Sequence, residues 1–298
     1  MRLLILGRDG QVGTALTQVL APLGEIVAFG RDGADLSQPG KLRALVESVE
    51  PHIIVNAGAY TAVDKAENEA DLARVVNADA PAALAAAAVA CGAWLIHYST
   101  DYVFDGRKPA PYVEDDETQP LNVYGETKRA GEVSISESGA RHLIFRTSWV
   151  HAPGRNSFAA KILSLAQSRE ELKVIDDQVG APTSARLIAE ITRRAIEQID
   201  RGRPLDNGTY HLSAAGETSW HGYARYVVDA ALQHGLPLRT SLERIVPVPS
   251  AEFPSPARRP HNSRLSTYKL RRALGIDLPD WPADLQGTLD SLLPEPTR

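Results

Sequence analysis

The stretch MRLLILGRDGQVG, residues 1–13, decides the fold. Its apolar run LLIL predicts a buried strand, and the residues that follow the glycines predict a helix. Gly7, Gly10 and Gly13 lie between the two and allow the backbone to approach a pyrophosphate closely, with the helix N-terminus facing the negative charge. The spacing differs from the usual Gly-x-Gly-x-x-Gly pattern. We interpret this turn as the seat of a dinucleotide rather than an ordinary strand-to-helix connection.

The first half of the chain continues this alternation of strand and helix. Short apolar runs separated by helical segments are typical of a parallel sheet with helices on both faces. The predicted strands are residues 2–6, 26–29, 53–56, 94–99 and 143–147, and the predicted helices are residues 11–20, 41–49, 81–91 and 123–136. The fold class is therefore α/β, with a doubly wound parallel sheet of the Rossmann type.

The second half of the chain is less regular. Helical patterns at residues 158–167, 185–199 and 223–233 are separated by short strand candidates and loops. Five prolines between residues 245 and 260 exclude a continuous helix there and favour an extended loop. These features predict a second, smaller α/β lobe.

This change of pattern also predicts the domain organisation. We expect residues 1–148 to form the dinucleotide-binding domain, with segments near residues 176–203 and 237–248 returning to it. Residues 149–298 are expected to form mainly the domain that binds the substrate. A chain of 298 residues is long enough for two such units.

Composition and charge narrow the class of protein. With 43% hydrophobic and 23% charged residues, the chain has the composition of a soluble globular protein. Its net charge of −5 argues against a nucleic-acid or membrane partner. Cys91 is the only cysteine, so we expect no disulfide framework and a reducing, cytoplasmic location. The opening apolar run is too short for a signal peptide, and we expect no membrane span.

Three side chains in the middle of the chain predict its chemistry. Tyr124 and Lys128 are four positions apart, so on a helix that begins after Asn122 they share one face. A phenol has a pKa of about 10, and a neighbouring ammonium is expected to lower the pKa of Tyr124 towards working pH. Thr100 ends the preceding strand, and its hydroxyl would hydrogen-bond the oxygen of a bound ketone, the oxygen that receives the proton of Tyr124. Together these groups predict reduction of a ketone, with Tyr124 supplying the proton.

The end of the second strand bears on the choice between NADPH and NADH. An acidic residue there usually binds the ribose 2′-hydroxyl, and an arginine accommodates a 2′-phosphate. Here the strand runs into Gly30-Arg31-Asp32, which offers both residue types within two positions. Arg31 favours NADPH, and NADH stays an open alternative.

Several longer motifs carry a resemblance to a known family. Through almost its whole length the chain resembles the dTDP-4-dehydrorhamnose reductases, which are extended short-chain dehydrogenases. The motifs are GRDGQVG from Gly7, VNAGAYTAVDKAE from Val55, HYSTDYVFDG from His97, PLNVYGETKRAGE from Pro120, FRTSWV from Phe145, DDQVGAPT from Asp176 and RPHNSRL from Arg259. This set is specific to the family rather than to nicotinamide enzymes in general.

The resemblance assigns roles to individual residues. Beside Gly7, Gly13 and Arg31, it implies a cofactor site of Gly10, Gln11 and Val12 at the pyrophosphate, Asp35 and Leu36 near the adenine, and Ala59, Tyr60, Thr61, Tyr98, Tyr124 and Lys128 at the nicotinamide end. It implies a catalytic triad of Thr100, Tyr124 and Lys128, with Thr100, Asp101, Tyr102 and Trp149 at the sugar nucleotide. Arg259 and Asn262 are further substrate candidates, with turn chemistry in a proline-rich loop as the open alternative.

The resemblance also implies the activity. The expected reaction is NADPH-dependent reduction of the C4 ketone of dTDP-4-dehydro-L-rhamnose, the last step of dTDP-rhamnose biosynthesis. The partner is then a small dTDP-sugar, and we expect a monomer or a weak homodimer. Family members that use magnesium carry a glutamate in the first helix where this chain has Ala15. We therefore expect no required metal.

Two alternatives stay open. One is another nucleotide-sugar reductase, an epimerase or a dehydratase of the same superfamily. Dehydratases carry Thr-Asp-Glu after the strand, and this chain has Tyr102 in place of the glutamate base that elimination needs. An epimerase would retain its cofactor through a full redox cycle, so net consumption of NAD(P)H separates it from a reductase. The other is a non-catalytic NADP-binding regulatory subunit, which the intact Thr100, Tyr124 and Lys128 disfavour.

Overall fold

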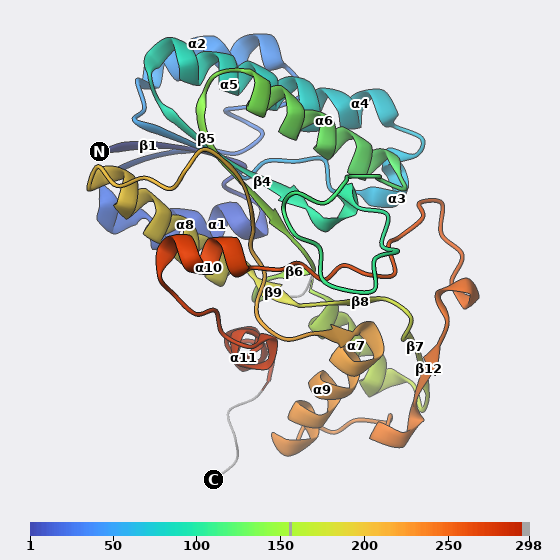
Figure 1. Cartoon of the computed structure of the whole chain (residues 1–298). Helices are drawn as coiled ribbons and strands as arrows, with labels where there is room; N and C mark the ends of the chain where they lie inside the picture. Colours follow the sequence, from blue (N-terminus) through green and yellow to red (C-terminus); the bar gives the residue numbers. More distant parts are fainter. Residues whose placement is uncertain (155–156, 294–298) are drawn as a thin grey trace.

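The structure, a computed structural model, describes residues 1–154 and 157–293 (Figure 1). Its centre is a six-stranded parallel sheet in the order β2-β1-β3-β4-β5-β10. The strands are β1 (Arg2–Leu6), β2 (Glu25–Phe29), β3 (Ile53–Asn56), β4 (Trp94–Thr100), β5 (Arg141–Thr147) and β10 (Gly208–His211). The chain leaves β1 for β2 and then returns to the other side of β1 as β3. This reversal creates a switch point at the carboxyl ends of β1 and β3, where open α/β sheets bind their ligands.

Helices cover both faces of this sheet in two layers (Figure 1). One face is covered by α1 (Gln11–Val19), α8 (Ala185–Asp200) and α10 (Tyr268–Leu274), and the other by α2 (Leu42–Val49), α5 (Ala80–Cys91) and α6 (Val123–Glu137). Side chains alternate between these layers along each strand. On β4, Ile96 packs with the α1 and α8 layer, and Leu95 packs with the α2 and α5 layer.

The alanine-rich helix α5 continues a longer helical stretch. α4 (Ala70–Arg74) and a π-helical turn at Val75–Asp79 precede it, and Pro81 lies in its first turn as predicted. By length and composition Ala70–Cys91 could cross a membrane, yet 56% of its apolar window is buried inside the protein. The stretch packs beside α2 and α6, as a core helix of the sheet domain does.

A third apolar cluster lies away from the sheet, in the lower part of Figure 1, and we call this part the lower lobe. It is formed by α7 (Phe158–Ser168), β7 (Leu172–Ile175), α9 (Trp220–Gln233), β12 (Ile245–Val248) and α11 (Trp281–Asp290). Short elements lie between it and the sheet: β6 (Val150–His151), β8 (Val179–Gly180), β9 (Thr183–Ser184) and β11 (Thr218–Ser219). The short helix α3 (Val63–Ala66) follows β3 and packs against α4 and α6.

Strand pairing corrects one predicted return to the sheet. The segment 237–248 contains β12, which pairs in parallel with β7, so that Ile245 lies opposite Leu172. Both residues are buried in the apolar cluster of the lower lobe. The segment stays in this lobe because its apolar side chains find their partners on α9 and β7. By contrast, α8 packs against α1, and β10 extends the sheet beside β5.

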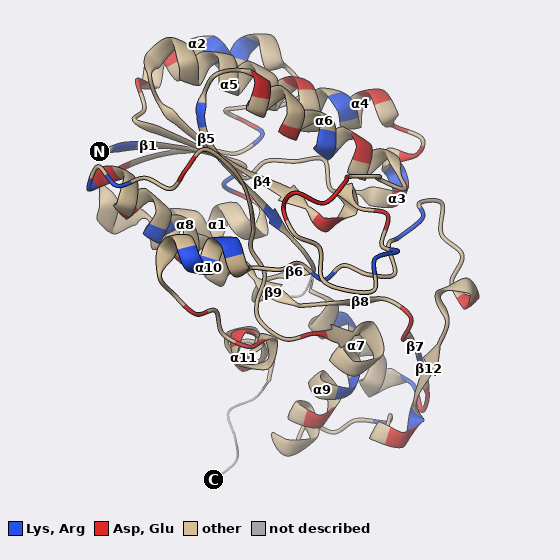
Figure 2. Cartoon of the chain, viewed as in Figure 1, with Lys and Arg blue, Asp and Glu red and all other residues tan. Residues whose placement is uncertain are grey.

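Charged residues of both signs are interspersed over the outer helices rather than gathered by sign (Figure 2). Several are i,i+4 pairs on exposed helix faces, such as Arg43 with Glu47 and Arg186 with Glu190. Such exposed pairs contribute little to stability. A few charged side chains lie buried near the carboxyl edge of the sheet, among them Asp101 and Lys128.

Candidate active site

The glycine turn forms a cradle at the carboxyl end of β1. Gly7 has a φ of +80°, a conformation that favours glycine, and its N–H donates to Phe29 O at 3.0 Å. A side chain at Gly13 would collide with the carbonyl oxygen of Gly7. Helix α1 begins after Gly10 without a side-chain cap, so the N–H groups of Gln11 and Val12 in its first turn are available to an anion. The turn therefore fits the pyrophosphate of a dinucleotide.

Arginine and acidic side chains gather at the end of β2, beside this cradle. The predicted residue Arg31 is exposed in the turn after β2. Arg8, which sequence reasoning did not single out, donates to Ala28 O at 3.2 Å and lies 3.3 Å from the Asp32 carboxylate. The structure thus offers two guanidinium groups where a 2′-phosphate would lie. Asp32 is the acidic alternative for a 2′-hydroxyl.

Asp35 and Leu36 lie on the turn that follows. The Asp35 carboxylate accepts from Ser37 N at 2.9 Å, and this hydrogen bond lowers the pKa of Asp35. Leu36 is buried, and its side chain lies where a side chain at Gly58 would be. Leu36 therefore presents an apolar surface beside the glycine turn.

The loop after β3 carries Ala59, Tyr60 and Thr61 to the same edge of the sheet. Ala59 and Tyr60 are half-buried, and Thr61 is exposed. The backbone of Tyr60 is held at both its groups, since its N–H donates to Asn77 Oδ1 at 2.8 Å and its carbonyl accepts from Asn77 Nδ2 at 3.1 Å. Asn77 lies in the π-helical turn before α5, so this irregular turn fixes the loop.

Helix α6 brings Tyr124 to the end of β4. As predicted, Asn122 caps this helix by accepting from Gly125 N at 2.8 Å. The Tyr124 ring packs edge-on against Tyr102, with 5.7 Å between ring centroids. Burial raises the pKa of Tyr124 to about 12, the Thr100 hydroxyl opposes that rise through hydrogen bonding, and the Asp101 charge adds to it.

Lys128 is buried between α6 and β4. Its side chain is 1% exposed, and Nζ donates to Tyr98 O at 2.6 Å and lies 3.1 Å from His97 Nε2. Burial lowers the pKa of Lys128 to about 8, and the Glu132 carboxylate partly opposes this. The expectation that Lys128 lowers the pKa of Tyr124 is therefore wrong for the ligand-free protein, because burial dominates the pKa of both groups.

Thr100 and Asp101 form the polar end of β4. Thr100 Oγ1 accepts from Tyr102 N at 3.1 Å and donates to Asp101 Oδ1 at 3.2 Å. Asp101 is 3% exposed, and its Oδ2 has no hydrogen-bond partner among the described residues. Burial raises the pKa of Asp101 to about 7, and hydrogen bonds from Ser263 and Thr100 oppose the rise. An unpaired buried carboxyl oxygen at this edge is free to meet a ligand hydroxyl.

Tyr98 does not present its side chain to this edge. Its ring lies in the apolar cluster under α8, and its hydroxyl is 2.7 Å from Thr192 Oγ1. The alternation of side chains along β4 puts Tyr98 and its neighbour His97 on opposite faces of the sheet. What Tyr98 offers the site is its carbonyl oxygen, which holds Lys128. The place of Tyr98 at the nicotinamide end stays a prediction, and it would be filled by the backbone of Tyr98 rather than its side chain.

Trp149, a predicted substrate residue, lies between β5 and β6. It is one of two non-glycine residues with positive φ in the described chain, at 47°. Its ring stacks on Trp220 with centroids 3.7 Å apart, and it lies against Gly180, where a side chain would collide with it. Trp220 in turn donates from Nε1 to Gln178 Oε1 at 3.2 Å. Backbone strain of this kind is found at functional sites.

Arg259 lies on a segment that crosses the site, residues 254–262, which we call the strap. Its guanidinium is 2.8 Å from the Asp64 carboxylate on α3, and this contact lowers the pKa of Asp64. The strap is also held by Asn122 Nδ2, which donates to Arg258 O at 2.6 Å. Burial raises the pKa of Tyr102, and the charge of Arg259 partly opposes this rise. Arg259 therefore lies against the predicted substrate residues.

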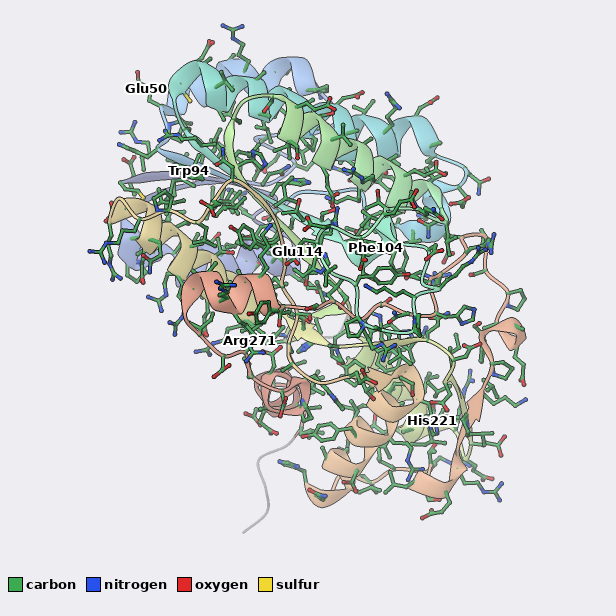
Figure 3. All side chains as sticks on the ribbon, viewed as in Figure 1. Glu50, Trp94, Phe104, Glu114, His221 and Arg271 are labelled. Carbon is green, nitrogen blue, oxygen red and sulfur yellow. The ribbon has the colours of Figure 1, made fainter. Side chains whose placement is uncertain are left out.

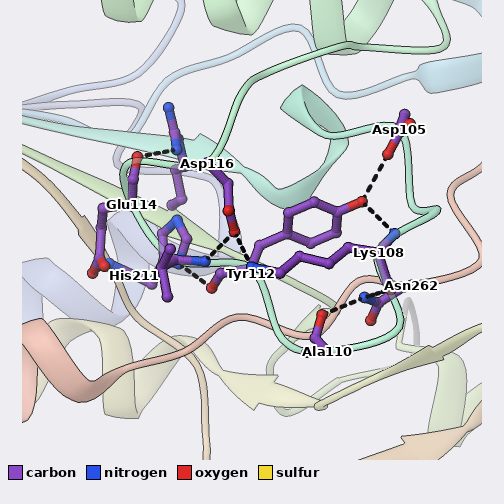
Figure 4. A network of polar contacts seen from close by, with 10 residues as sticks. Asp105, Lys108, Ala110, Tyr112, Glu114, Asp116, His211 and Asn262 are labelled. Carbon is purple, nitrogen blue, oxygen red and sulfur yellow. Dashed lines mark hydrogen bonds and ion pairs between the residues drawn. The ribbon is translucent and has the colours of Figure 1, made fainter.

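Asn262 serves the loop instead (Figure 4). Its amide nitrogen donates to Lys108 O at 2.7 Å and Ala110 O at 2.9 Å, and its amide oxygen accepts from the backbone and side chain of Arg264. These four hydrogen bonds use the whole amide. The structure thus favours turn chemistry for Asn262, and we remove it from the candidate ligands.

The loop after β4 is fixed by the network drawn in Figure 4. Tyr112 donates from its hydroxyl to Asp105 Oδ1 at 2.7 Å, and its ring stacks on Phe104 with centroids 4.1 Å apart. Phe104 and Glu114 lie between the sheet and the lower lobe (Figure 3). Glu114 accepts from the backbone N–H of His211 at 2.8 Å, which ties the loop to β10.

A second buried cation pairs with Glu132, which lies one helical turn beyond Lys128 on α6. Arg146 on β5 is 4% exposed and makes a two-pronged contact with Glu132 on α6, with Nε and Nη2 each 2.8 Å from a carboxylate oxygen. Its guanidinium also lies over the Phe104 ring, 5.0 Å from the centroid. This pair fastens α6 to the sheet. Among the described residues no three His, Cys, Asp or Glu side chains gather as metal ligands.

Comparison with known proteins shows the family to which the chain belongs. Over residues 1–293 the chain matches the family described as RmlD substrate binding domain. The dTDP-4-dehydrorhamnose reductase of Escherichia coli (strain K12) is 49% identical over 296 residues, which cover 98% of each chain. That of Burkholderia thailandensis is 48% identical over 286 residues, which cover 94% of this chain and 95% of the other. This chain belongs to the dTDP-4-dehydrorhamnose reductase family.

Solved structures agree with membership of the reductase family. The dTDP-4-dehydrorhamnose reductase from Bacillus anthracis in complex with NADP has a TM-score of 0.86 at 33% identity and covers 97% of this chain and 98% of that one. The one from Clostridium acetobutylicum has a TM-score of 0.88 at 33% identity, with 98% and 99% covered. UDP-glucose 4-epimerase from Thermus thermophilus, at 17% identity and a TM-score of 0.78, shares the fold alone.

In this member of the reductase family, sequence reasoning missed four further residues besides Arg8: Asn56, Asp64, His97 and Trp220. Two of them carried a signal. Asn56 ends the apolar run of β3 and His97 follows the apolar run of β4, and polar residues in such buried strands usually have a partner. Asp64 and Trp220 gave no such signal, since their partners lie 195 and 71 positions away.

Proposed function

We propose that this chain reduces the C4 ketone of dTDP-4-dehydro-L-rhamnose to dTDP-L-rhamnose with NADPH, or with NADH in its place. The bound cofactor would supply a hydride to C4. Tyr124 donates its proton to the oxygen that becomes the new hydroxyl, and the Thr100 hydroxyl orients that oxygen. Hydride and proton together account for the two electrons and two hydrogens that the ketone gains.

The observation that carries the proposal is a buried, protonated phenol at the carboxyl end of β4. With its pKa raised to about 12, Tyr124 keeps its proton at neutral pH and can give it to an alkoxide as that alkoxide forms. The uncapped start of α1 lies at the same edge of the sheet. A proton donor beside an anion seat is the arrangement that cofactor-dependent ketone reduction needs.

The surrounding residues support an assignment of the two ligands. We assign the cofactor to the glycine turn, Arg8, Arg31, Leu36 and the loop at residues 59–61. We assign the sugar nucleotide to the space between the sheet and the lower lobe, where Asp101, Tyr102, Trp149 and Arg259 gather. Because the family members named above are reductases, the intact triad favours an enzyme over a regulatory subunit.

The first prediction tests this function directly. The purified protein is mixed with NADPH and dTDP-4-dehydro-L-rhamnose, and NADPH absorbance is followed with product analysis. We expect stoichiometric NADPH consumption, and for Tyr124→Phe a rate lower by about 10²–10⁴-fold, because the proton donor is lost while the cofactor contacts remain. NADPH affinity, measured by titration, serves as the control.

Two results would contradict the proposal. Interconversion of sugars without net NADPH consumption would indicate an epimerase. A Tyr124→Phe variant with near-normal turnover would remove Tyr124 from its role. We further propose that the protein works in the cytoplasm as a monomer or weak homodimer, which light scattering at assay concentration tests.

A further inference from the structure

Among the buried titratable groups that the mechanism above does not use, His97 on β4 is one that contacts Lys128. It is 1% exposed and lies between two polar side chains, Asn56 on the neighbouring strand and Lys128 on α6. The distances are 3.2 Å from Asn56 Nδ2 to His97 Nδ1 and 3.1 Å from His97 Nε2 to Lys128 Nζ. These three side chains form a chain of contacts that begins behind the sheet edge and ends at a residue of the triad.

Asn56 fixes the direction in which the hydrogen bonds between these three side chains are donated. Its Oδ1 accepts from the backbone N–H of Gly58 at 3.2 Å, so its Nδ2 is the atom that faces His97. An amide nitrogen donates and does not accept. His97 Nδ1 therefore accepts, and the proton of the neutral imidazole is on Nε2. Burial lowers the pKa of His97 well below its usual range, which keeps the ring neutral.

With its hydrogen on Nε2, His97 disfavours the charged form of Lys128. An ammonium has three donors and no acceptor, so it cannot take the hydrogen that Nε2 carries. A neutral amine can accept it while still donating to Tyr98 O, which lies 2.6 Å away. The arrangement therefore favours loss of a proton from Lys128, and it does so through hydrogen-bond direction in addition to burial.

Other groups around Lys128 do not cancel this effect. From its own helix the facing charge is Glu132, whose oxygens are already engaged by Arg146 at 2.8 Å. Asn56 on β3 is neutral, and Asn77 in the π-helical turn is neutral and bonded to Thr127. His97 is the group on β4 that faces Lys128. It is thus the group placed to govern the protons of Lys128.

We propose that His97, oriented by Asn56, is a positioning residue that sets whether Lys128 holds its third proton. The proposal rests on the proposed function, because it gives Lys128 the task of exchanging protons near neutral pH. Lys128 lies one helical turn from Tyr124 on α6, and Tyr124 gives up one proton in each turnover. A lysine that both gains and loses its proton at working pH is suited to that exchange.

The experiment measures protons on the free protein, before any turnover. The His97 tautomer is determined from the ring nitrogen shifts by NMR, and the pKa of Lys128 from the shift of its labelled Cε. In the wild type we expect the hydrogen on Nε2. Hydrogen on Nδ1 would overturn the proposal, whether or not the protein is an active reductase.

Two substitutions are designed to reverse the direction of hydrogen-bond donation between His97 and Lys128. Asn56→Asp places a carboxylate that accepts from Nδ1–H, and this leaves the Nε2 lone pair to accept from Lys128. His97→Gln places an amide oxygen near the position of Nε2. Each is expected to raise the pKa of Lys128 by about one unit or more. The alkaline limb of the kcat profile should move upward with it, which changes the rate on that limb by about tenfold per unit.

A matched control separates this effect from general damage. His142→Gln makes the same change at another buried histidine of the sheet, whose Nδ1 contacts Ala140 O at 2.8 Å away from Lys128. We expect the Lys128 pKa and the alkaline limb to stay in place there. If they also stay in place in both Asn56→Asp and His97→Gln, His97 is merely structural and the proposal fails. Failure of the wild type to oxidise NADPH would instead contradict the proposed function.

Discussion

Two buried cations lie under helix α6, and the structure surrounds them in opposite ways. Arg146 is 4% exposed and has a carboxylate on two of its nitrogens, both at 2.8 Å. Lys128, which lies on α6 one turn before Glu132, is 1% exposed and has a neutral imidazole and a carbonyl as its partners. The charge of Arg146 is compensated in place, whereas the charge of Lys128 is not.

The difference shows how one helix can serve two purposes. A guanidinium stays charged at every accessible pH, so the Glu132–Arg146 pair is a permanent fastening between α6 and β5. An ammonium without a contacting carboxylate is costly to bury, and its pKa falls to about 8. The fastening keeps α6 in place, and the uncompensated cation provides a group that titrates near working pH.

Breaking the buried Glu132–Arg146 ion pair should have the largest effect on stability. Glu132→Gln leaves Arg146 buried without its counter-ion, and loss of one partner of a buried pair typically costs about 3–5 kcal/mol. We expect the free energy of unfolding in urea to fall by this amount. The double variant Glu132→Met with Arg146→Met should recover most of the loss, because it removes both charges. A single variant as stable as the wild type would contradict the role given to this pair.

The uncompensated cation should appear in the pH dependence of stability. Because the folded pKa of Lys128 is about 8 and its ordinary value is 10.5, the unfolded state binds the extra proton between these pH values. Stability contributed by this residue therefore rises with pH across that window, by up to about 3 kcal/mol in all. Lys128→Met should lack this rise when unfolding is measured from pH 7.5 to 10.5. An equal slope in wild type and variant would show that Lys128 is not strained by its burial.

Among these variants, the substitution of Lys108, a partly exposed cation in the network of Figure 4, should have the smallest effect on stability. Lys108 is 2.5 Å from the Asp116 carboxylate, with side chains 32% and 25% exposed (Figure 4). Pairs that water reaches contribute about 0.2–1 kcal/mol. Lys108→Met should therefore change the midpoint of urea unfolding only slightly, and added salt should weaken the difference further. A loss as large as that of Glu132→Gln would remove the distinction between buried and accessible pairs.

Local patterns in the sequence predicted most of the elements. β3 and the start of α6 lie at the predicted residues, because an apolar run and a capping Asn122 specify them without distant partners. The sixth strand, β10, was not predicted, since its residues join the sheet only through pairing with β5. The segment 237–248 was wrongly returned to the sheet for the same reason: β12 pairs with β7, and no local signal chooses between two sheets.

Several of the predicted site residues lie together at the end of β4, but their electrostatics were not predictable. Spacing alone placed Tyr124 and Lys128 on one face of α6. It could not show that the Lys128 ammonium turns towards His97, because that depends on which groups of β4 lie under the helix. Strand alternation, applied to β4, would have separated Tyr98 from His97 and removed the side chain of Tyr98 from the nicotinamide end.

The strap has a consequence for how the protein is made. A ribosome delivers the chain from its N-terminus, and Asp64 leaves it 195 residues before Arg259 does. Throughout translation of the intervening residues, Asp64 stays hydrated and the sugar side of the edge stays open. The glycine turn and its strands, by contrast, are complete early. The glycine turn is therefore made long before the Arg259–Asp64 contact can form.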